Sequence, residues 1–189
     1  TLITPVSPVV RVNAFRGDPI VYGVPGNPGF ILLGAGTGVF LRTAASGAPA
    51  QVSTLPATVA DVAVDRDAPA RLFAMTNSAV FFSTDSGATI PAVTGNLISA
   101  FNPGTLRTMA FIPSATDAIV VGTDRGVYIA NGPAFNVWSP LASGLPNVVV
   151  YELDYDVADQ LLVAGTLGRG AWRLSLANAD PIYSNGFEP

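Results

Sequence analysis

A short motif recurs four times along this chain of 189 residues: an apolar strand, a glycine-rich turn, and a second strand that opens on an apolar–aromatic pair. The residues just before that pair are Gly38, Ala79, Gly126 and Gly170, so the motif returns after 41, 47 and 44 residues. Steps of this length are typical of a four-stranded propeller blade. The repeat therefore predicts an all-β propeller with four four-stranded blades in this chain and essentially no α-helix.

The composition agrees with a chain of short strands and tight turns. Hydrophobic residues make up 49% of the sequence, and there are 19 glycines and 16 prolines. Only 12% of the residues are charged, about half the usual share. The nine basic residues are all arginines and are scattered singly, so no basic stripe is present to neutralise a phosphate backbone. This pattern disfavours nucleic-acid binding.

Three residue types that carry much enzyme chemistry are missing from the sequence. There is no Cys, no His and no Lys. Their absence removes disulfides, thiolate nucleophiles, a Ser-His-Asp triad, His-ligated metal sites and Schiff-base chemistry. The sequence predicts no cofactor. Its longest apolar runs are strand-sized, far below a membrane span. The chain begins at Thr1 without a signal peptide, which indicates either a mature secreted product or an excerpt of a longer protein.

The repeat divides the chain into blades 14–54, 55–97, 98–145 and 146–176, followed by a tail, 177–189. The fourth blade has no outer strand. We expect residues 1–13, with the run Val9–Val12, to supply that strand from the same chain or from a neighbouring one, because a bare sheet edge invites aggregation. Alternatively the chain is the C-terminal part of a larger ring, or two copies pair into eight blades. The expected strands are 19–24, 30–34, 38–42 and 50–54; 59–64, 71–75, 79–83 and 89–93; 108–112, 118–122, 126–130 and 136–139; and 148–155, 160–164 and 170–176.

The segment Ser83-Thr-Asp-Ser-Gly-Ala-Thr-Ile90 resembles the Asp box, Ser/Thr-x-Asp-x-Gly-x-Thr-Trp/Phe, of the bacterial neuraminidase repeat (BNR). In such a turn Asp85 would accept backbone N–H groups, Gly87 would take a positive φ, and Thr89 would begin the next strand. Ile90 stands where the family has an aromatic residue. The lead-in 62–73 and the stretch 145–172 are also similar to such repeats, so the resemblance covers about residues 14–176. The other boxes are degenerate, with Ala45 near the Asp position of the first blade.

This resemblance implies a fold with no single activity attached. Asp boxes occur in sialidases, other glycan-cleaving enzymes, sortilin-type receptors and assembly factors, and they lie on the blade periphery. A sialidase would need three converging arginines, a Tyr nucleophile with a Glu partner, and an Asp acid. Glu152 and Glu188 are the only glutamates, and no stretch matches the arginine pattern. Sialidase activity is therefore not expected of this chain alone, and no catalytic residue is assigned.

Two equivalent hairpin turns hold the candidate ligand residues. Asp124 and Arg125 lie in one and Arg169 in the other, so they could line one ligand-facing rim, although exposed turns need no function to explain them. The acidic residues Asp154, Asp156 and Asp159 are weak candidates for a Ca²⁺ site; a solvated strand face and turn caps explain them better. Two tryptophans, at positions 138 and 172, could stack on sugars, but their repeat positions favour packing.

The tail segment Ile182–Glu188 is similar to short endings of exported bacterial proteins, which places the protein outside the cell or on the cell surface. Together these features predict an extracellular binding or scaffold module for a protein or glycan ligand. We expect this module to be non-catalytic on its own rather than an enzyme. Other blades, another chain or a second copy are the expected structural partners. The alternative is a piece of a secreted glycosidase or protease whose catalytic residues lie outside this chain.

Overall fold

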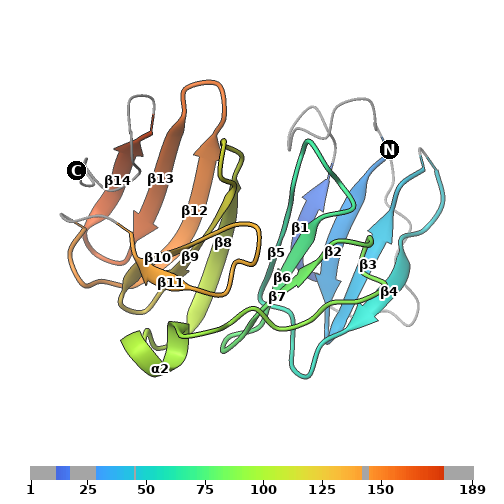
Figure 1. The fold of residues 1–189 in the computed structure, drawn as a ribbon, viewed down its shortest axis with the longest axis horizontal. Coiled ribbons are helices and arrows are strands. Elements are labelled where there is room, and N and C mark those ends of the chain that lie inside the picture. The colour runs from blue at the N-terminus through green and yellow to red at the C-terminus, as the bar shows by residue number, and fades with distance from the viewer. Residues whose placement is uncertain (1–11, 18–28, 45, 142–144, 177–189) are drawn as a thin grey trace. The chain divides into compact units, whose positions relative to one another are not determined.

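The computed structural model describes residues 12–17, 29–44, 46–141 and 145–176. The chain divides into two compact units, residues 1–93 and 94–189. Each unit contains two antiparallel sheets (Figure 1). No helix among the described residues is long and apolar enough to cross a membrane.

Unit 1 holds the first two sheets. The first sheet has the strand order β1-β2-β3-β4, and the second has the order β5-β6-β7. In place of a fourth strand in the second sheet, a single bridge joins Phe81 to Ala92. The strands are β1 (Val12–Gly17), β2 (Ile31–Ala35), β3 (Gly38–Arg42), β4 (Ala50–Thr54), β5 (Asp61–Val64), β6 (Leu72–Met75) and β7 (Val80–Ser83).

Unit 2 repeats this plan and adds one short helix. Its first sheet has the order β11-β10-β9-β8, and its second has three strands in the order β12-β13-β14. The elements are α2 (Leu97–Phe101), β8 (Leu106–Ile112), β9 (Ala118–Thr123), β10 (Gly126–Asn131), β11 (Trp138–Pro140), β12 (Val150–Asp156), β13 (Leu161–Thr166) and β14 (Gly170–Ser175).

Each unit has its own core, formed where its two sheets pack together. In unit 1, β5 packs against β1 and β2, and Leu32, Val59 and Leu72 are fully buried there. In unit 2, β12 packs against β8 and β9 around Val120, Val150 and Leu162. Burial of this kind is worth about 1.5–3 kcal/mol for each large aliphatic side chain, so the cores supply the main favourable term in folding.

Two glycines mark where these sheets approach most closely. A Cβ at Gly34 would lie 2.3 Å from Cγ1 of Val59, and a Cβ at Gly122 would lie 2.8 Å from Cγ1 of Val150. Both glycines sit near the end of the second strand of their sheet, facing residues that lead into or begin the next sheet. The close packing therefore requires a residue without a side chain at these two positions.

The nearly all-β fold and most strand positions agree with the sequence prediction, with the following differences. The expected strand 19–24 lies outside the described residues, and the strand paired with β2 is β1. Val12 and Asn13 belong to β1, so assigning them to a closing strand was wrong. The expected strand 89–93 is reduced to the bridge at Ala92. The short helix α2 was not expected. It ends at Asn102, whose left-handed φ of 45° terminates the helix.

Burial does not follow the simple alternation of inward and outward residues that a half-exposed strand shows. Every residue of β2, β5, β6 and β7 is buried, so these strands are covered on both faces and their sequences are almost continuously apolar. Within this fully buried sheet the rings of Phe73 and Phe82 stack with centroids 4.5 Å apart. Period-2 alternation is clearest in β13 and β14, whose sheet is more exposed.

Candidate functional site

The two hairpin turns of unit 2 are built in the same way. In the β9–β10 turn the hydroxyl of Thr123 donates to the carbonyl oxygen of Gly126 at 3.0 Å and accepts the N–H of Arg125 at 3.0 Å. In the β13–β14 turn the hydroxyl of Thr166 donates to the carbonyl oxygen of Gly170 at 2.6 Å. A threonine that ends the second strand therefore fixes each turn, and the two turns project from equivalent ends of their sheets.

A β-bulge stands beside each of these turns. The register of β8 against β9 shifts between Leu106 and Thr108, and that of β12 against β13 shifts between Val150 and Glu152. The extra residues are Arg107 and Tyr151, and a bulge re-aims the side chain it carries. We call this end of unit 2 the rim. It consists of Arg107, Asp124, Arg125, Tyr151, Leu167 and Arg169.

Asp124 uses its carboxylate to hold Arg107. Oδ1 of Asp124 accepts a hydrogen bond from Nε of Arg107 at 2.6 Å, and Oδ2 accepts the backbone N–H of Thr105 at 3.0 Å. The Thr105 N–H is the main reason that the pKa of Asp124 lies below its ordinary value; Arg107 adds to the effect, and partial desolvation opposes it. The side chains of Arg107 and Asp124 are 28% and 29% exposed, so the pair is screened by water and its role is positional.

Arg107 also lies over Tyr151. Its Cζ atom is 4.8 Å from the centroid of the tyrosine ring, a cation–π distance. Tyr151 is nevertheless 51% exposed, and Leu167 in the neighbouring turn is 58% exposed. The two bulges thus bring a cation and an aromatic ring from adjacent sheets into contact at the surface.

The three rim residues expected from the sequence are arranged differently from one another. Asp124 turns back toward Thr105 and Arg107, as described above. Nη1 of Arg125 donates to the carbonyl oxygen of Asn102 at 2.9 Å, which ties the turn to the residue after α2. The side chain of Arg169 is exposed, and its backbone carbonyl accepts Nε1–H of Trp172 at 3.0 Å.

Sequence reasoning missed Arg107 and Tyr151 as members of the rim. Strict period-2 alternation puts Tyr151 on the same strand face as Leu153, but the bulge breaks that alternation at Tyr151. No local signal separates these two residues from their neighbours, because polar residues also occur further along β8 and β12.

The turn at Ser83–Thr89 has the expected hydrogen bonds. Oδ1 of Asp85 accepts the backbone N–H of Thr89 at 2.9 Å, and Oδ2 accepts the hydroxyl of Thr89 at 2.7 Å. The hydroxyl of Ser83 donates to Oδ1 of Asp85 at 2.8 Å and accepts the N–H of Gly87 at 2.8 Å. Gly87 has a φ of +88°, and Ile90 packs against the core of unit 1.

These bonds hold the pKa of the Asp85 carboxyl below its usual value. The largest contribution is the backbone N–H of Thr89, followed by the hydroxyls of Thr89 and Ser83. Every polar atom of the carboxylate is thereby used within the turn. The turn is a structural device that joins β7 to the segment carrying Ala92.

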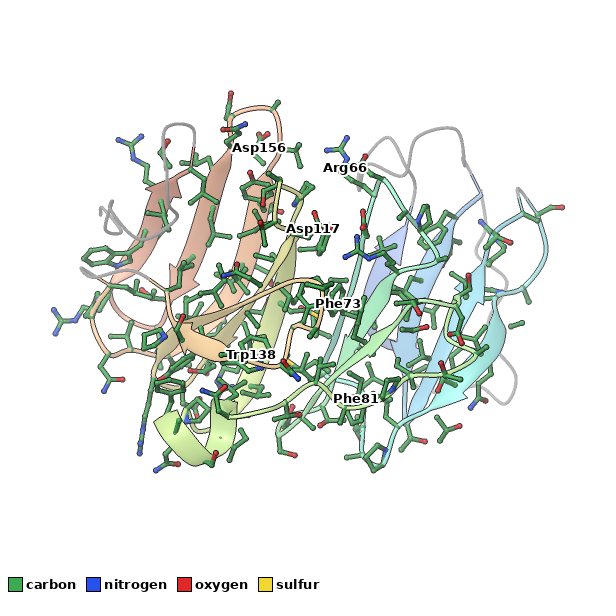
Figure 2. The ribbon with its side chains drawn as sticks, viewed as in Figure 1. Arg66, Phe73, Phe81, Asp117, Trp138 and Asp156 are labelled. Atoms are coloured by element: carbon green, nitrogen blue, oxygen red, sulfur yellow. The ribbon has the colours of Figure 1, made fainter. Side chains whose placement is uncertain are left out.

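The acidic residues of β12 and the following turn do not form a metal centre. Among the residues that the structure describes, no three Asp, Glu, His or Cys side chains gather as metal ligands. Oδ1 of Asp156 accepts the backbone N–H groups of Ala158 at 2.8 Å and Asp159 at 3.2 Å, so it caps the β12–β13 turn. Figure 2 shows Asp156 at the end of β12 that lies away from α2, opposite the rim. Burial raises the pKa of Tyr155, and the Asp156 carboxylate adds to that rise.

The two tryptophans pack within unit 2. Trp138, labelled in Figure 2, is 2% exposed. Its backbone N–H donates to Oδ1 of Asn96 at 2.7 Å, and its backbone carbonyl oxygen accepts Nδ2–H of Asn96 at 3.0 Å. Trp172 is partly buried against the unit 2 core. Neither ring is presented as a flat, open platform for a sugar.

Solved structures similar to this chain include both enzymes and binding proteins. The structure of YCF48 bound to D1 peptide matches with a TM-score of 0.68 and 11% identity, over 98% of this chain and 56% of that one. A nidogen/laminin complex matches with a TM-score of 0.67 and 10% identity, over 89% and 62%. The GH74 enzyme of Niastella koreensis matches with a TM-score of 0.65 and 15% identity, over 88% and 28%.

These likenesses identify the class of fold. The neighbours are β-propeller proteins, and the four antiparallel sheets of this chain are consistent with propeller blades, so the chain has a propeller-type fold. At 10–15% identity the likeness extends to the fold alone. The chain spans between 28% and 62% of the length of these structures. No family model matches the sequence, and no curated protein matches it.

Proposed function

We propose that this chain is an extracellular binding or scaffold module of a bacterial protein, non-catalytic on its own, and that it binds a protein or glycan ligand through the rim of unit 2. The observation that carries the proposal is the surface pair of Arg107 and Tyr151. Asp124 accepts a hydrogen bond from Arg107, and both Arg107 and Tyr151 lie at β-bulges. Tyr151 remains 51% exposed. Rigidly held arginine and tyrosine side chains are the types most enriched at binding hot spots.

Two of the similar structures support a binding role, because each is a complex with another molecule. One is YCF48 with a D1 peptide, and the other is a nidogen/laminin complex. Binding by such a module requires no catalytic group, which suits a sequence without Cys, His or Lys. We also propose that the Ser83–Thr89 turn is an Asp box of the BNR type, supported by the hydrogen bonds of Asp85 and Ser83.

The test is to probe peptide and glycan arrays with the full chain and with a Tyr151→Ser variant. We expect the wild-type chain to bind at least one ligand class and the variant to lose most of that signal, because the rim ring is removed while the buried cores stay intact. A control variant, Asp67→Ala, changes an exposed turn of unit 1. If neither array contains a ligand whose binding depends on Tyr151, the proposal is wrong.

The second candidate function is a piece of a secreted hydrolase whose catalytic residues lie outside this chain. Its support is the match to GH74 enzymes, including the xyloglucanase of Xanthomonas campestris with a TM-score of 0.63, 15% identity and coverage of 93% of this chain but only 32% of that enzyme. The full open reading frame distinguishes the two candidates. A glycosidase or protease domain encoded with this chain favours the hydrolase, and its absence favours the binding module.

A further inference from the structure

The rim places exposed apolar surface next to a cation. The large hydrophobic side chains that the structure describes as exposed are those of Ile98, Val137, Tyr151 and Leu167, and two of these four lie at the rim. The backbone N–H of Leu167, in the β13–β14 turn, donates to the carbonyl oxygen of Val149 at 2.9 Å. Val149 lies two residues before Tyr151, so Leu167 and Tyr151 belong to the same end of this sheet. Exposed apolar side chains that gather at one place on a protein, rather than being scattered singly, are typical of interaction sites.

The guanidinium of Arg107 has N–H groups that make no hydrogen bond to Asp124. Its Nε–H donates to Asp124, and its Cζ atom lies over the Tyr151 ring. Within the described residues no acceptor is assigned to its two terminal nitrogens. Two parallel N–H groups at the end of a guanidinium match the two oxygens of a carboxylate. In the described structure Asp124 contacts Arg107 through Nε, and its other oxygen faces the N–H of Thr105.

We propose that the rim binds an extended acidic peptide, with a carboxylate of the peptide on the terminal nitrogens of Arg107 and an adjacent apolar side chain of the peptide on Tyr151 and Leu167. This inference rests on the proposed binding function and names its ligand class. Arg125 and Arg169 lie in the two turns of the same rim, so further acidic residues of the peptide meet positive charge on either side.

The chemistry of the rim favours a peptide over a glycan. A sugar needs a free aromatic face and a dense set of hydrogen-bonding groups, whereas one face of Tyr151 is covered by the Arg107 guanidinium and Leu167 offers only aliphatic carbon. A peptide supplies a carboxylate and an apolar group within neighbouring residues. Both requirements of the rim are thus met by one short segment.

The experiment is a fluorescence-anisotropy titration of the full chain with two labelled twelve-residue peptides. One alternates Glu with Leu and Phe between glycine spacers, and the other has Gln at every Glu position. We expect the Glu peptide to bind and the Gln peptide to bind at least about tenfold more weakly, since the charge-assisted pair with Arg107 is lost. Arg107→Gln should weaken the Glu peptide by a similar factor.

Two further variants complete the test. Arg66→Gln removes the same charge from unit 1 and should leave binding of the Glu peptide nearly unchanged. Leu167→Ser alters an exposed turn side chain, so it should fold normally, and it should weaken binding even if Arg107→Gln fails to fold. Equal weakening by Arg107→Gln and Arg66→Gln, equal binding of the two peptides, or no binding at about 1 mM peptide by folded wild-type protein overturns the inference.

The outcome also separates this inference from the proposed function. If the arrays give a glycan or a neutral peptide whose binding depends on Tyr151, the binding module stands and the acidic-peptide inference is wrong. If no ligand depends on the rim, both are wrong. Binding of the Glu peptide that requires Arg107 and Leu167 supports both.

Discussion

At the scale of single residues, the molecule uses its few charged side chains mainly to fix turns. Backbone N–H groups are accepted by the carboxylates of Asp85, Asp124 and Asp156, and each of these residues lies at or just after the end of a strand. In a sequence with 12% charged residues, this leaves few charges for other tasks. Arg107, whose partly exposed guanidinium uses only its Nε–H in a hydrogen bond to Asp124, is therefore the more informative residue.

The Asp85 turn makes a stability prediction. Replacing Asp85 with Ala removes the acceptors for the N–H and hydroxyl of Thr89. We expect the melting temperature to fall by about 2–4 °C, the size of shift that the loss of one favourable turn interaction gives in a chain of this length. Differential scanning calorimetry measures it. Asp67→Ala is the matched control, because Asp67 is exposed in a turn of the same unit and should change little. Equal shifts in the two variants contradict a structural role for the turn.

The same residue predicts a pH dependence. The pKa of Asp85 in the folded chain lies below its ordinary value of 3.8. A carboxyl with a lowered folded pKa stabilises the fold above its unfolded pKa, and this contribution disappears as the pH falls through the folded value. The melting-temperature gap between wild type and Asp85→Ala should therefore be constant from about pH 7 to 5 and should narrow below about pH 4. A gap that widens toward acid would show that the sign is wrong.

At the scale of elements, the sequence predicted most strands but missed the strand β1 and the short helix α2. Turn anchors such as Gly126 and Gly170, both with positive φ, located β10 and β14 correctly. The strand 12–17 was missed because its sequence, Val-Asn-Ala-Phe-Arg-Gly, is less β-like than the valine-rich segment after it. The five residues of α2 are too few to show a helical period.

The candidate site was predicted only in part, for a physical reason. Sequence reasoning located Asp124, Arg125 and Arg169, because glycine-rich turns between apolar strands can be recognised from the sequence alone. Arg107 and Tyr151 were not located, because a bulge is decided by the pairing of two strands and leaves no mark in either strand alone. The contact between them joins residues from two sheets, which no local pattern records.

The approach of neighbouring sheets makes a prediction for glycine. A Cβ at Gly122 would lie 2.7 Å from Cγ2 of Thr108 and 2.8 Å from Cγ1 of Val150, and both neighbours are buried. Gly122→Ala should destabilise the chain by about 1–3 kcal/mol, because β-branched side chains in a packed core have little room to move. Gly165 is the matched control. It occupies the same position before the β13–β14 turn, but a Cβ there would meet nothing closer than 3.6 Å.

Urea denaturation of Gly122→Ala and Gly165→Ala measures the difference. Both variants change the unfolded chain in the same way, so the difference between them isolates the clash in the folded state. A Gly165→Ala variant as unstable as Gly122→Ala would mean that the sheets do not meet at Gly122 as described. The prediction therefore tests the sheet-to-sheet packing directly.

At the scale of the whole molecule, the sheet of β12, β13 and β14 differs from the other three in the described part of the chain. The third strands of two other sheets, β3 and β10, pair with β4 and β11, and β7 makes a bridge to Ala92. β14 pairs only with β13 there. The N–H of Leu176 donates to the carbonyl oxygen of Gln160 at 2.8 Å. Because hydrogen-bonded pairs alternate along an antiparallel ladder, the N–H groups of Ala171 and Ser175 point away from β13.

We expect this edge to be completed by an added strand, from residues 1–11 or from another chain, because unpaired edges promote aggregation. Hydrogen exchange measures the completion directly. The amides of Ala171 and Ser175 should be protected in the full chain, and deleting residues 1–11 should expose them if the strand comes from this chain's own N-terminal segment. The amides of Trp172 and Leu174, which bond to β13, serve as internal controls and should stay protected in both forms. Protection that disappears on dilution, together with a falling native mass, assigns the strand to a second copy. Fast exchange of Ala171 and Ser175 in the full chain at every concentration would show that the edge is bare, and the expected closure would then be wrong.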